Sequence, residues 1–383
     1  MHDALSRIEK RVRVALLLLF THTEDGARAR FENSILFLDD CEVPAHSSVR
    51  ALDSVSISPV ETPEMGATTR AMAACCGRIE RACDSVVGVI GPPMFIFGLT
   101  LIIGIAHSSA RWTHEELRMR GRERMASACD VVVWTCAVNA VFNHVMCAMT
   151  RPGSPKDAKA RRAIERASAP SGDGADPESR LKEVIERGRY CETCDVVKPD
   201  MTHHCSVCRR CVLKMDHHCP WVMNCVGARN YRFFFNFIAY AWLGCLTVSL
   251  AGAAVLFERE YPIRHVTSEE TFRGVIFVSV MAVAVFAALS FLVSWQAYLA
   301  LTGQTTIDYY TWSDARKALK ARGMPYGEFQ RPPFHQGSRA KNWQEAFDER
   351  GRFWYVAWCL PRLRAHSGSG VYYEAHGPRA LAC

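Results

Sequence analysis

The sequence predicts an all-α membrane protein: a bundle of four transmembrane helices, with a small domain rich in cysteine and histidine between the second and third helices. Two observations support this fold class. Hydrophobic residues make up 49% of the 383 residues, and four segments with little or no formal charge reach the roughly 20 apolar residues that a bilayer-spanning helix needs. Seven cysteines and four histidines are concentrated between Cys191 and Cys225, after the second segment.

The first expected span is residues 86–106. It follows an N-terminal region, 1–85, which shows no sustained periodicity over most of its length and which we expect to be partly disordered. The span contains Gly91-Pro92-Pro93, so its helix should bend or break near the membrane entrance. An apolar stretch at 12–20 resembles a signal-peptide core, but no small-residue cleavage site follows it. We interpret it as a short amphipathic segment.

The second expected span, 129–149, follows a loop at 107–128. It is less clear than the others, because Asn139, Asn143 and His144 interrupt it. Polar residues in a membrane helix more often face a neighbouring helix than a substrate. We therefore assign these three residues no chemical role.

The third and fourth expected spans, 233–257 and 274–302, are the clearest. They have 25 and 29 residues, with no Asp, Glu, Lys or Arg between their ends, and are joined by a loop at 258–273. The alternative reading is that all four segments are buried helices of a large soluble protein. Four such runs in one chain make that alternative improbable.

The distribution of Lys and Arg orients the bundle. An even number of spans places both termini and the loop at 150–232 on one side of the membrane. Residues 151–190 carry ten Lys and Arg, whereas 258–273 carry three, and basic loops face the cytosol; five arginines in 107–128 argue weakly for the opposite orientation. We therefore expect three cytosolic regions around a cytosolic cysteine-rich domain: 1–85, a linker at 150–190, and 303–383 with a disordered tail.

The cysteines and histidines have metal-ligand spacing. The chain reads Cys191-x2-Cys194-x9-His204-Cys205-x2-Cys208-x2-Cys211-x7-Cys219-x5-Cys225, with His203, His217 and His218 as further candidates. Such dense spacing favours metal ligation in a reducing compartment over a disulfide framework. Two tetrahedral zinc sites take eight ligands, so the seven cysteines and four histidines leave three candidates over.

The run Asp216-His217-His218-Cys219 places an acid, a base and a thiol within four residues. A cysteine reacts as its thiolate, an adjacent imidazole can take its proton, and a carboxylate can hold that imidazole in the required tautomer. If Cys219 bound zinc, its nucleophilicity would be quenched. The run therefore predicts a cysteine nucleophile.

Residues 191–230 resemble the cysteine-rich domain of the DHHC palmitoyltransferase family. The similarity includes Lys198-Pro199, Asp216 to Val222, Asn224 to Gly227, and Asn230. Outside this domain, shorter motifs extend the resemblance over roughly residues 85–360: Arg151-Pro152-Gly153, Thr305-Thr306-Ile307-Asp308, Asn342-Trp343 and Phe347.

The resemblance implies two zinc ions in a cytosolic domain of small β-hairpins at 191–232. It assigns one zinc to Cys191, Cys194, His204 and Cys211, and the other to Cys205, Cys208, His218 and Cys225. It also implies a protein S-acyltransferase in which Cys219 takes a long-chain acyl group from acyl-CoA and passes it to protein cysteines. His217 would be the base, and Asp216 would orient it.

Further roles follow from the same resemblance. Thr306 should hydrogen-bond toward Asp216. Arg189, Lys198 and His203 surround the zinc ligands, where the phosphates of acyl-CoA could dock, although each is otherwise an ordinary surface group. The aromatic residues Phe233, Phe234, Phe235 and Trp242 could line a cavity for the acyl chain, or could simply pack against helices or lipid.

The sequence departs from the family pattern at three positions. Met201 stands where the family has arginine, Arg151 replaces an acid, and Asp308 is one methylene shorter than the usual glutamate. None of these removes a predicted ligand or catalytic group. Cys75, Cys76 and Cys83 precede the first span and could themselves be S-acylated.

Two other classes of protein could use such a module: a membrane-anchored zinc-binding adaptor or RING-like ubiquitin ligase, and a zinc-containing nucleic-acid binder. The five residues between Cys219 and Cys225 disfavour a RING-like pattern, and four spans disfavour a nucleic-acid partner. We therefore expect a multi-pass protein of Golgi or ER membranes, whose partners are the bilayer, acyl-CoA and proteins with cytosolic juxtamembrane cysteines.

Overall fold

The structure is a computed structural model, and it describes residues 67–167, 190–257, 268–321, 332, 334–361 and 370–371. Several sequence-based expectations lie outside the described residues. These are most of the N-terminal region, the linker between 168 and 189 with Arg189, most of the loop at 258–273, and the side chains of Cys75, Cys76 and Cys83.

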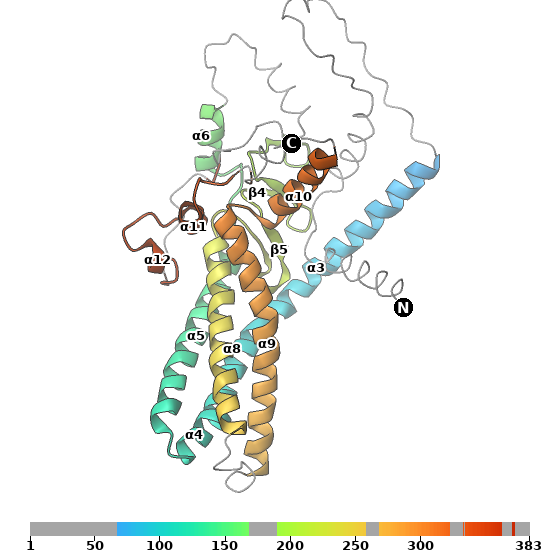
Figure 1. Cartoon of the computed structure of the whole chain (residues 1–383). Coiled ribbons are helices and arrows are strands. Elements are labelled where there is room, and N and C mark those ends of the chain that lie inside the picture. The colour runs from blue at the N-terminus through green and yellow to red at the C-terminus, as the bar shows by residue number, and fades with distance from the viewer. Residues whose placement is uncertain are drawn as a thin grey trace, which may run out of the picture.

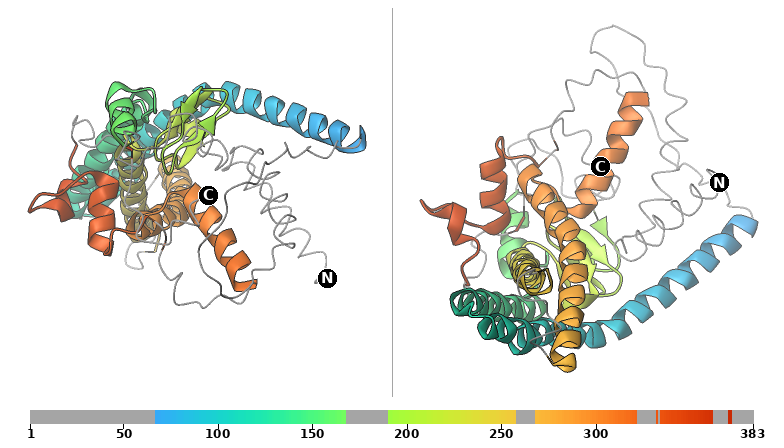
Figure 2. Two further views of the ribbon diagram at one scale, coloured as in Figure 1. Left: turned by 90° about the horizontal axis from the view of Figure 1, so that it is seen from above. Right: turned by 60° about the horizontal axis from the view of Figure 1, so that its bottom comes forward.

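Four helical segments are long and apolar enough to cross a membrane, which confirms the predicted fold class and makes the chain a multi-pass membrane protein. The first comprises the end of α3 (Ala67–Ser108), a π-helical turn η1 (Ser109–His114) and α4 (Glu115–Met119); the others are α5 (Glu123–Met149), α8 (Tyr231–Leu256) and α9 (Glu269–Thr302). Helices α5, α8 and α9 run side by side, whereas α3 crosses them obliquely (Figures 1 and 2).

Small residues let the spans approach closely. At Gly252 in α8, an added Cβ would lie 2.1 Å from the Oγ atom of Ser279 in α9. At Gly274 in α9, it would lie 2.3 Å from the indole of Trp112. Membrane helices associate through such close packing, because lipid tails are as apolar as the side chains they would replace.

The first connection between spans differs from the expected loop at 107–128. The chain stays helical to Met119, and only Arg120 to Arg122 separate α4 from α5. Two charged residues of this segment are buried as a pair: Arg120 binds Glu116 at 3.0 Å and the carbonyl of Val255 at 2.9 Å. Paired charges can remain in a buried helix, whereas unpaired ones cannot.

Of the expected bend or break in the first span, a break does not occur in the described helix: α3 continues through Pro92 and Pro93. Each proline removes one N–H donor, and the helix tolerates both. The fourth span begins five residues before its apolar run. Ser268 caps α9 by accepting a hydrogen bond from the Thr271 N–H, and Gly303 ends it with φ of 72°, as a left-handed C-terminal glycine commonly does.

The domain between α5 and α8 consists of three antiparallel β-hairpins at one end of the bundle (Figure 1). The hairpins pair β1 (Tyr190–Cys191) with β2 (Val196–Val197), β3 (His203–Cys205) with β4 (Arg210–Val212), and β5 (His217–Cys219) with β6 (Asn224–Val226). A short 3-10 helix, η2 (Pro220–Val222), joins β5 to β6 and packs against α3. The amphipathic helix α6 (Ala158–Ala167) covers another side, with Ala160 packed against Leu213 and Ala228.

The C-terminal region returns to the same end of the bundle. Helix α10 (Thr306–Ala321) follows α9 directly, and α11 (Arg339–Phe347) packs on α8 and α9 through an aromatic cluster around Phe347 and Phe235. The Asn342 side chain donates to the carbonyl of Leu301 at 2.7 Å. A short helix, α12 (Trp354–Ala357), follows.

Candidate active site and metal centres

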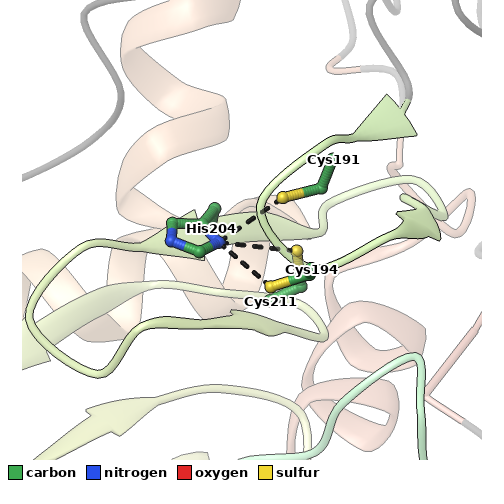
Figure 3. A group of neighbouring side chains, drawn as sticks. All are labelled: Cys191, Cys194, His204 and Cys211. Atoms are coloured by element: carbon green, nitrogen blue, oxygen red, sulfur yellow. Dashed lines mark hydrogen bonds between the residues drawn. The ribbon is translucent and has the colours of Figure 1, made fainter.

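Two groups of four side chains have the geometry of metal sites, and each contains the residues that the family resemblance assigns to one zinc ion. The ligand atoms within each group lie within 4.8 Å of one another. Figure 3 shows the first group, in which Nδ1 of His204 points at three sulfurs, 3.5 Å from Cys191, 3.2 Å from Cys194 and 3.9 Å from Cys211. In the second group, Nδ1 of His218 lies 3.7, 3.3 and 3.6 Å from the sulfurs of Cys205, Cys208 and Cys225.

These separations fit a tetrahedral zinc ion. Ligands that bind zinc at 2.0–2.3 Å lie roughly 3.5 Å from one another around the metal. Three thiolates with one imidazole are also a common structural zinc set. The CxxC pair within each group, Cys191 with Cys194 and Cys205 with Cys208, is followed by a residue in the left-handed region, Asp195 with φ of 54° and Arg209 with φ of 51°. The two turns therefore share one backbone conformation, which brings both cysteines of each pair toward the same centre.

Strand β5 directs successive side chains of the Asp-His-His-Cys run to opposite faces of the hairpin. Successive side chains in a strand point to opposite faces, so His217 and Cys219 share one face and His218 points to the other. The register supports this, because His218 pairs with the metal-group residue Cys225, whereas Cys219 pairs with Asn224. Adjacent histidines can therefore belong to different sites.

Asp216 is buried and accepts four hydrogen bonds. Its Oδ2 atom accepts from Nδ1 of His217 at 2.6 Å, from Nε2 of Gln296 at 3.0 Å and from Oγ1 of Thr306 at 3.1 Å. Its Oδ1 atom accepts from the Thr306 N–H at 2.8 Å. Burial alone would raise the pKa of Asp216, but these hydrogen bonds lower it below the ordinary value, so the group is a carboxylate at neutral pH. The expected contact between Thr306 and Asp216 is present.

His217 lies between this carboxylate and the thiol of Cys219. Burial lowers the pKa of His217, but its hydrogen bonds with Asp216 and with Cys219 outweigh burial and raise the pKa to about 10. The edge of the imidazole packs against Phe234, 5.0 Å between ring centroids. Because Asp216 can only accept, Nδ1 of His217 carries a proton. With the raised pKa, Nε2 also holds a proton at neutral pH, and this is the proton that His217 exchanges with the thiol. A carboxylate, an imidazole and a thiol in this order can activate the thiol as a nucleophile.

The expected aromatic residues separate into different environments. Phe233 and Phe234 pack in one buried cluster with Cys219, Cys147 and Val222. Phe235 instead joins the C-terminal aromatic cluster, and Trp242 donates to Oγ of Ser290 at 2.8 Å.

Two of the three expected phosphate contacts can be located. Lys198 and His203 lie beside the first metal group and are partly buried. Burial, with the positive charge of Lys198, lowers the pKa of His203 to about 4. His203 is therefore neutral at pH 7 and could offer a phosphate only a neutral N–H.

The departures from the family pattern have local explanations. Met201 is buried against Phe334 in a small apolar cluster, so its side chain contributes packing where an arginine would contribute charge. Arg151 is exposed. Asp308 accepts hydrogen bonds from the N–H and Oγ1 of Thr305, at 2.9 and 2.6 Å, and so closes the turn that presents Thr306.

Two side chains near the site were not predicted from the sequence. Gln296 contacts Asp216, and His144 donates through Nε2 to the carbonyl of Trp221 at 2.7 Å, two residues after Cys219. His144 also stacks on Phe237, 4.5 Å between ring centroids. The available signal was a polar residue in an apolar helix, and for His144 that signal was attributed to helix packing.

Comparisons with known proteins agree with this arrangement. The sequence model of the DHHC palmitoyltransferase family matches residues 184–313. The chain is similar to Palmitoyltransferase ZDHHC20 of Homo sapiens (39% identity, covering 44% of this chain and 42% of that protein), to Probable protein S-acyltransferase 16 of Arabidopsis thaliana (34%; 53% and 68%), and to Palmitoyltransferase PFA3 of Saccharomyces cerevisiae (33%; 60% and 69%). The chain spans only about half the length of Palmitoyltransferase ZDHHC20 of Homo sapiens and of Palmitoyltransferase ZDHHC15 of Xenopus laevis (37% identity).

Proposed function

We propose that this chain, which belongs to the DHHC palmitoyltransferase family, transfers a long-chain acyl group from acyl-CoA to cysteines of other proteins through an acyl-enzyme on Cys219. The observation that carries the proposal is the buried sequence of contacts from Asp216 through His217 to Cys219. It lies at the end of a four-span bundle, where an acyl chain could enter the membrane while the thiol meets a soluble cofactor.

The first half-reaction joins the sulfur of Cys219 to the carbonyl carbon of the acyl-CoA thioester. His217 takes the thiol proton, and the negative charge of Asp216 stabilises the resulting imidazolium. When the bond from that carbon to the CoA sulfur breaks, CoA leaves as a thiol with the proton from His217. In the second half-reaction, the thiol of a protein cysteine gives its proton to His217, and its sulfur bonds to the acyl carbon. The bond from that carbon to the Cys219 sulfur then breaks, and Cys219 regains its proton from His217.

Both half-reactions exchange one thioester for another, so positioning and proton transfer matter more than driving force. Zinc in the two groups of four would hold the hairpins in register and so fix the strand that carries Cys219. The chain's own helices fix the other side of the site through Thr306 and Gln296.

The acyl donor and protein substrates would reach the site from the hairpin side of the membrane, which the Lys and Arg distribution makes the cytosolic side. Burial of each CH2 group contributes about 0.8 kcal/mol, so an acyl chain lying beside Phe233 and Phe234 would be held strongly. Arg189 and Lys198 would contact the phosphates of CoA, with His203 as a neutral donor. We further propose that the protein resides in Golgi or ER membranes and that its substrates are proteins with juxtamembrane cysteines on the cytosolic side.

The test is incubation of the purified protein in detergent with labelled palmitoyl-CoA. Wild type should carry label in a hydroxylamine-sensitive bond, whereas Cys219→Ser should carry none and His217→Ala should acylate more slowly by about 10²-fold or more. The zinc ligand variant Cys208→Ala should lose activity together with zinc, whereas Cys219→Ser should keep both zinc ions. Equal labelling of Cys219→Ser and wild type would contradict the proposal.

A further inference from the structure

Gln296 is a polar side chain in a membrane-spanning helix, and within the described part of the chain its side chain hydrogen-bonds only to the acid of the candidate site. It lies about two turns before α9 ends at Thr302, and its side chain is 2% exposed. Its Nε2 atom donates to Oδ2 of Asp216 at 3.0 Å. Among the described residues, none hydrogen-bonds to its Oε1 atom.

The chemistry of the partner fixes the orientation of this amide. A carboxylate can only accept, so the atom of Gln296 that faces Asp216 must be the NH2 group. Burying the opposite oxygen without a partner costs free energy, and a leucine or methionine would avoid that cost. The donor to Asp216 is the one interaction in the described structure that a glutamine adds at this position.

The backbone of Gln296 is also held in place. The Tyr231 hydroxyl, from the first turn of α8, donates to the carbonyl of Gln296 at 3.2 Å. Tyr231 packs in turn against Phe235 and Phe347. The Gln296 side chain therefore extends from a part of α9 that packs against α8 and α11. This packing gives its NH2 group a defined position relative to Asp216.

The two donors to Oδ2 other than His217 reach Asp216 from different elements. Thr306 lies at the start of α10, and Gln296 lies within α9. Both are neutral. A lysine or arginine in either place would also orient the carboxylate, but it would cancel the negative charge that a protonated His217 needs.

We propose that Gln296 is a positioning residue that holds Oδ2 of Asp216 against Nδ1 of His217, so that a membrane-spanning helix orients the base of the candidate site. This inference rests on the proposed function. It predicts that the amide donor of Gln296 acts on the chemical step at Cys219 and leaves acyl-CoA binding unchanged.

The test compares Gln296→Met, which keeps the length of the side chain and removes the donor, with Gln296→His, which retains an N–H donor. The matched control is Ser290→Ala, which removes a hydrogen bond between α9 and α8, the one with Trp242, and leaves the hydrogen bonds to Asp216 in place. All variants are measured as full-length protein in detergent, in single turnovers over a series of palmitoyl-CoA concentrations, with zinc content determined for each.

Gln296→Met should lower the maximal rate of acyl-enzyme formation about tenfold, with unchanged zinc content and an unchanged half-saturating concentration. Gln296→His should recover part of the rate, and Ser290→Ala should react as wild type does. A Gln296→Met variant at the wild-type rate, a Gln296→His variant no faster than it, or an equal loss in Ser290→Ala would overturn the inference.

Alkylation of Cys219 by iodoacetamide, followed by mass spectrometry of its peptide, separates this inference from the proposed function. If wild type forms no acyl-enzyme, the proposed function fails. Slower alkylation of Cys219 in Gln296→Met than in wild type would then still support the positioning role, and equal alkylation rates would refute it.

Discussion

Asp308 is a partly buried acid whose surroundings disfavour its ionised form. Its carboxylate closes the turn at Thr305, but burial and, less strongly, the nearby negative charge of Asp216 raise the pKa of Asp308 to about 6, although the Thr305 hydrogen bonds lower it. The folded protein therefore binds a proton at Asp308 more tightly than the unfolded chain does. Its ionisation costs stability as pH rises through about 6, and protonation recovers that stability as pH falls toward 4.

The substitution Asp308→Asn should remove this pH dependence, because asparagine keeps an acceptor for the Thr305 turn and carries no charge. Near pH 7 the variant should be more stable than wild type by on the order of 2 kcal/mol, and the difference should shrink by pH 5. Thermal unfolding midpoints at both pH values measure it. Asp314→Asn, an exposed substitution on the same helix, is the control. A difference that stays constant between pH 7 and 5 would contradict the assignment.

At this scale the sequence indicated the candidate groups that lie within a few residues of one another. The candidate metal ligands and the Asp-His-His-Cys run are recognisable because their spacing is local. Gln296 was missed because it meets Asp216 only across the fold, and an apolar helix gives no indication of which of its faces meets another domain. Thr306 was found only because a short motif in a known family points to it.

The end of α5 is capped by asparagines from the hairpin domain. The Asn224 side chain donates to the carbonyls of Cys147, Ala148 and Thr150, at 3.1, 3.2 and 2.9 Å, which are among the last carbonyls of a helix and have no partner within it. Asn230 donates to the carbonyls of Cys147 and Thr150, at 3.3 and 3.4 Å. Since Asn224 pairs with Cys219 across the β5–β6 hairpin, this cap also joins the second span to the candidate nucleophile.

Asn224→Ala should therefore destabilise the protein by about 2 kcal/mol, because it leaves several buried carbonyls with fewer donors. The thermal unfolding midpoint in detergent should fall, and acyl-enzyme formation should slow as the hairpin loosens. Asn139→Ala is a suitable control, because Asn139 donates to the Thr135 carbonyl on an exposed face of the same helix. Equal midpoints for the two variants would show that the cap is unimportant.

The helices themselves could be predicted from the lengths of their apolar runs, but their ends could not. The run of charges at 107–128 indicates a loop only if those charges are solvated. In the structure, Arg120 pairs with Glu116 and reaches Val255 of α8. The contact of Arg120 with α8, which is distant in sequence, therefore lets the helices of the first and second spans continue closer to each other than the charges suggest.

Across the whole molecule, Arg232 ties the C-terminal region to the bundle. Its guanidinium binds Glu349 at 2.6 Å and donates to the carbonyls of Ala357 and Leu360, at 2.6 and 2.9 Å. The arginine and glutamate side chains are only 12% and 6% exposed. Asn236 of the same helix adds a bond to the carbonyl of Trp358 at 2.8 Å. The segment that follows α11 is thus held by one face of α8.

Arg232→Met should release this segment, because it removes the guanidinium that pairs with the buried Glu349 carboxylate and binds the carbonyls of Ala357 and Leu360. The cost should be about 3–5 kcal/mol, visible as faster proteolysis between residues 348 and 361 and as a lower unfolding midpoint. The double variant with Glu349→Gln should recover part of the loss. Arg350→Met removes an exposed pair with Glu345 and should change neither measurement. Unchanged proteolysis of Arg232→Met would contradict this account.

Because side chains alternate between the two faces of β5, an insertion or deletion in this strand should affect the site differently from a substitution. Replacing a residue in this strand keeps every other side chain on its face, whereas inserting or deleting one residue exchanges the two faces. A deletion between His217 and Cys219 removes His218. The thiol of Cys219 would then point toward the metal ligands, and His217 would lose its contact with that thiol. Homologous chains with a one-residue gap in this run should therefore retain the bundle and its hairpins but lack the reaction, and such a gap would mark an inactive descendant.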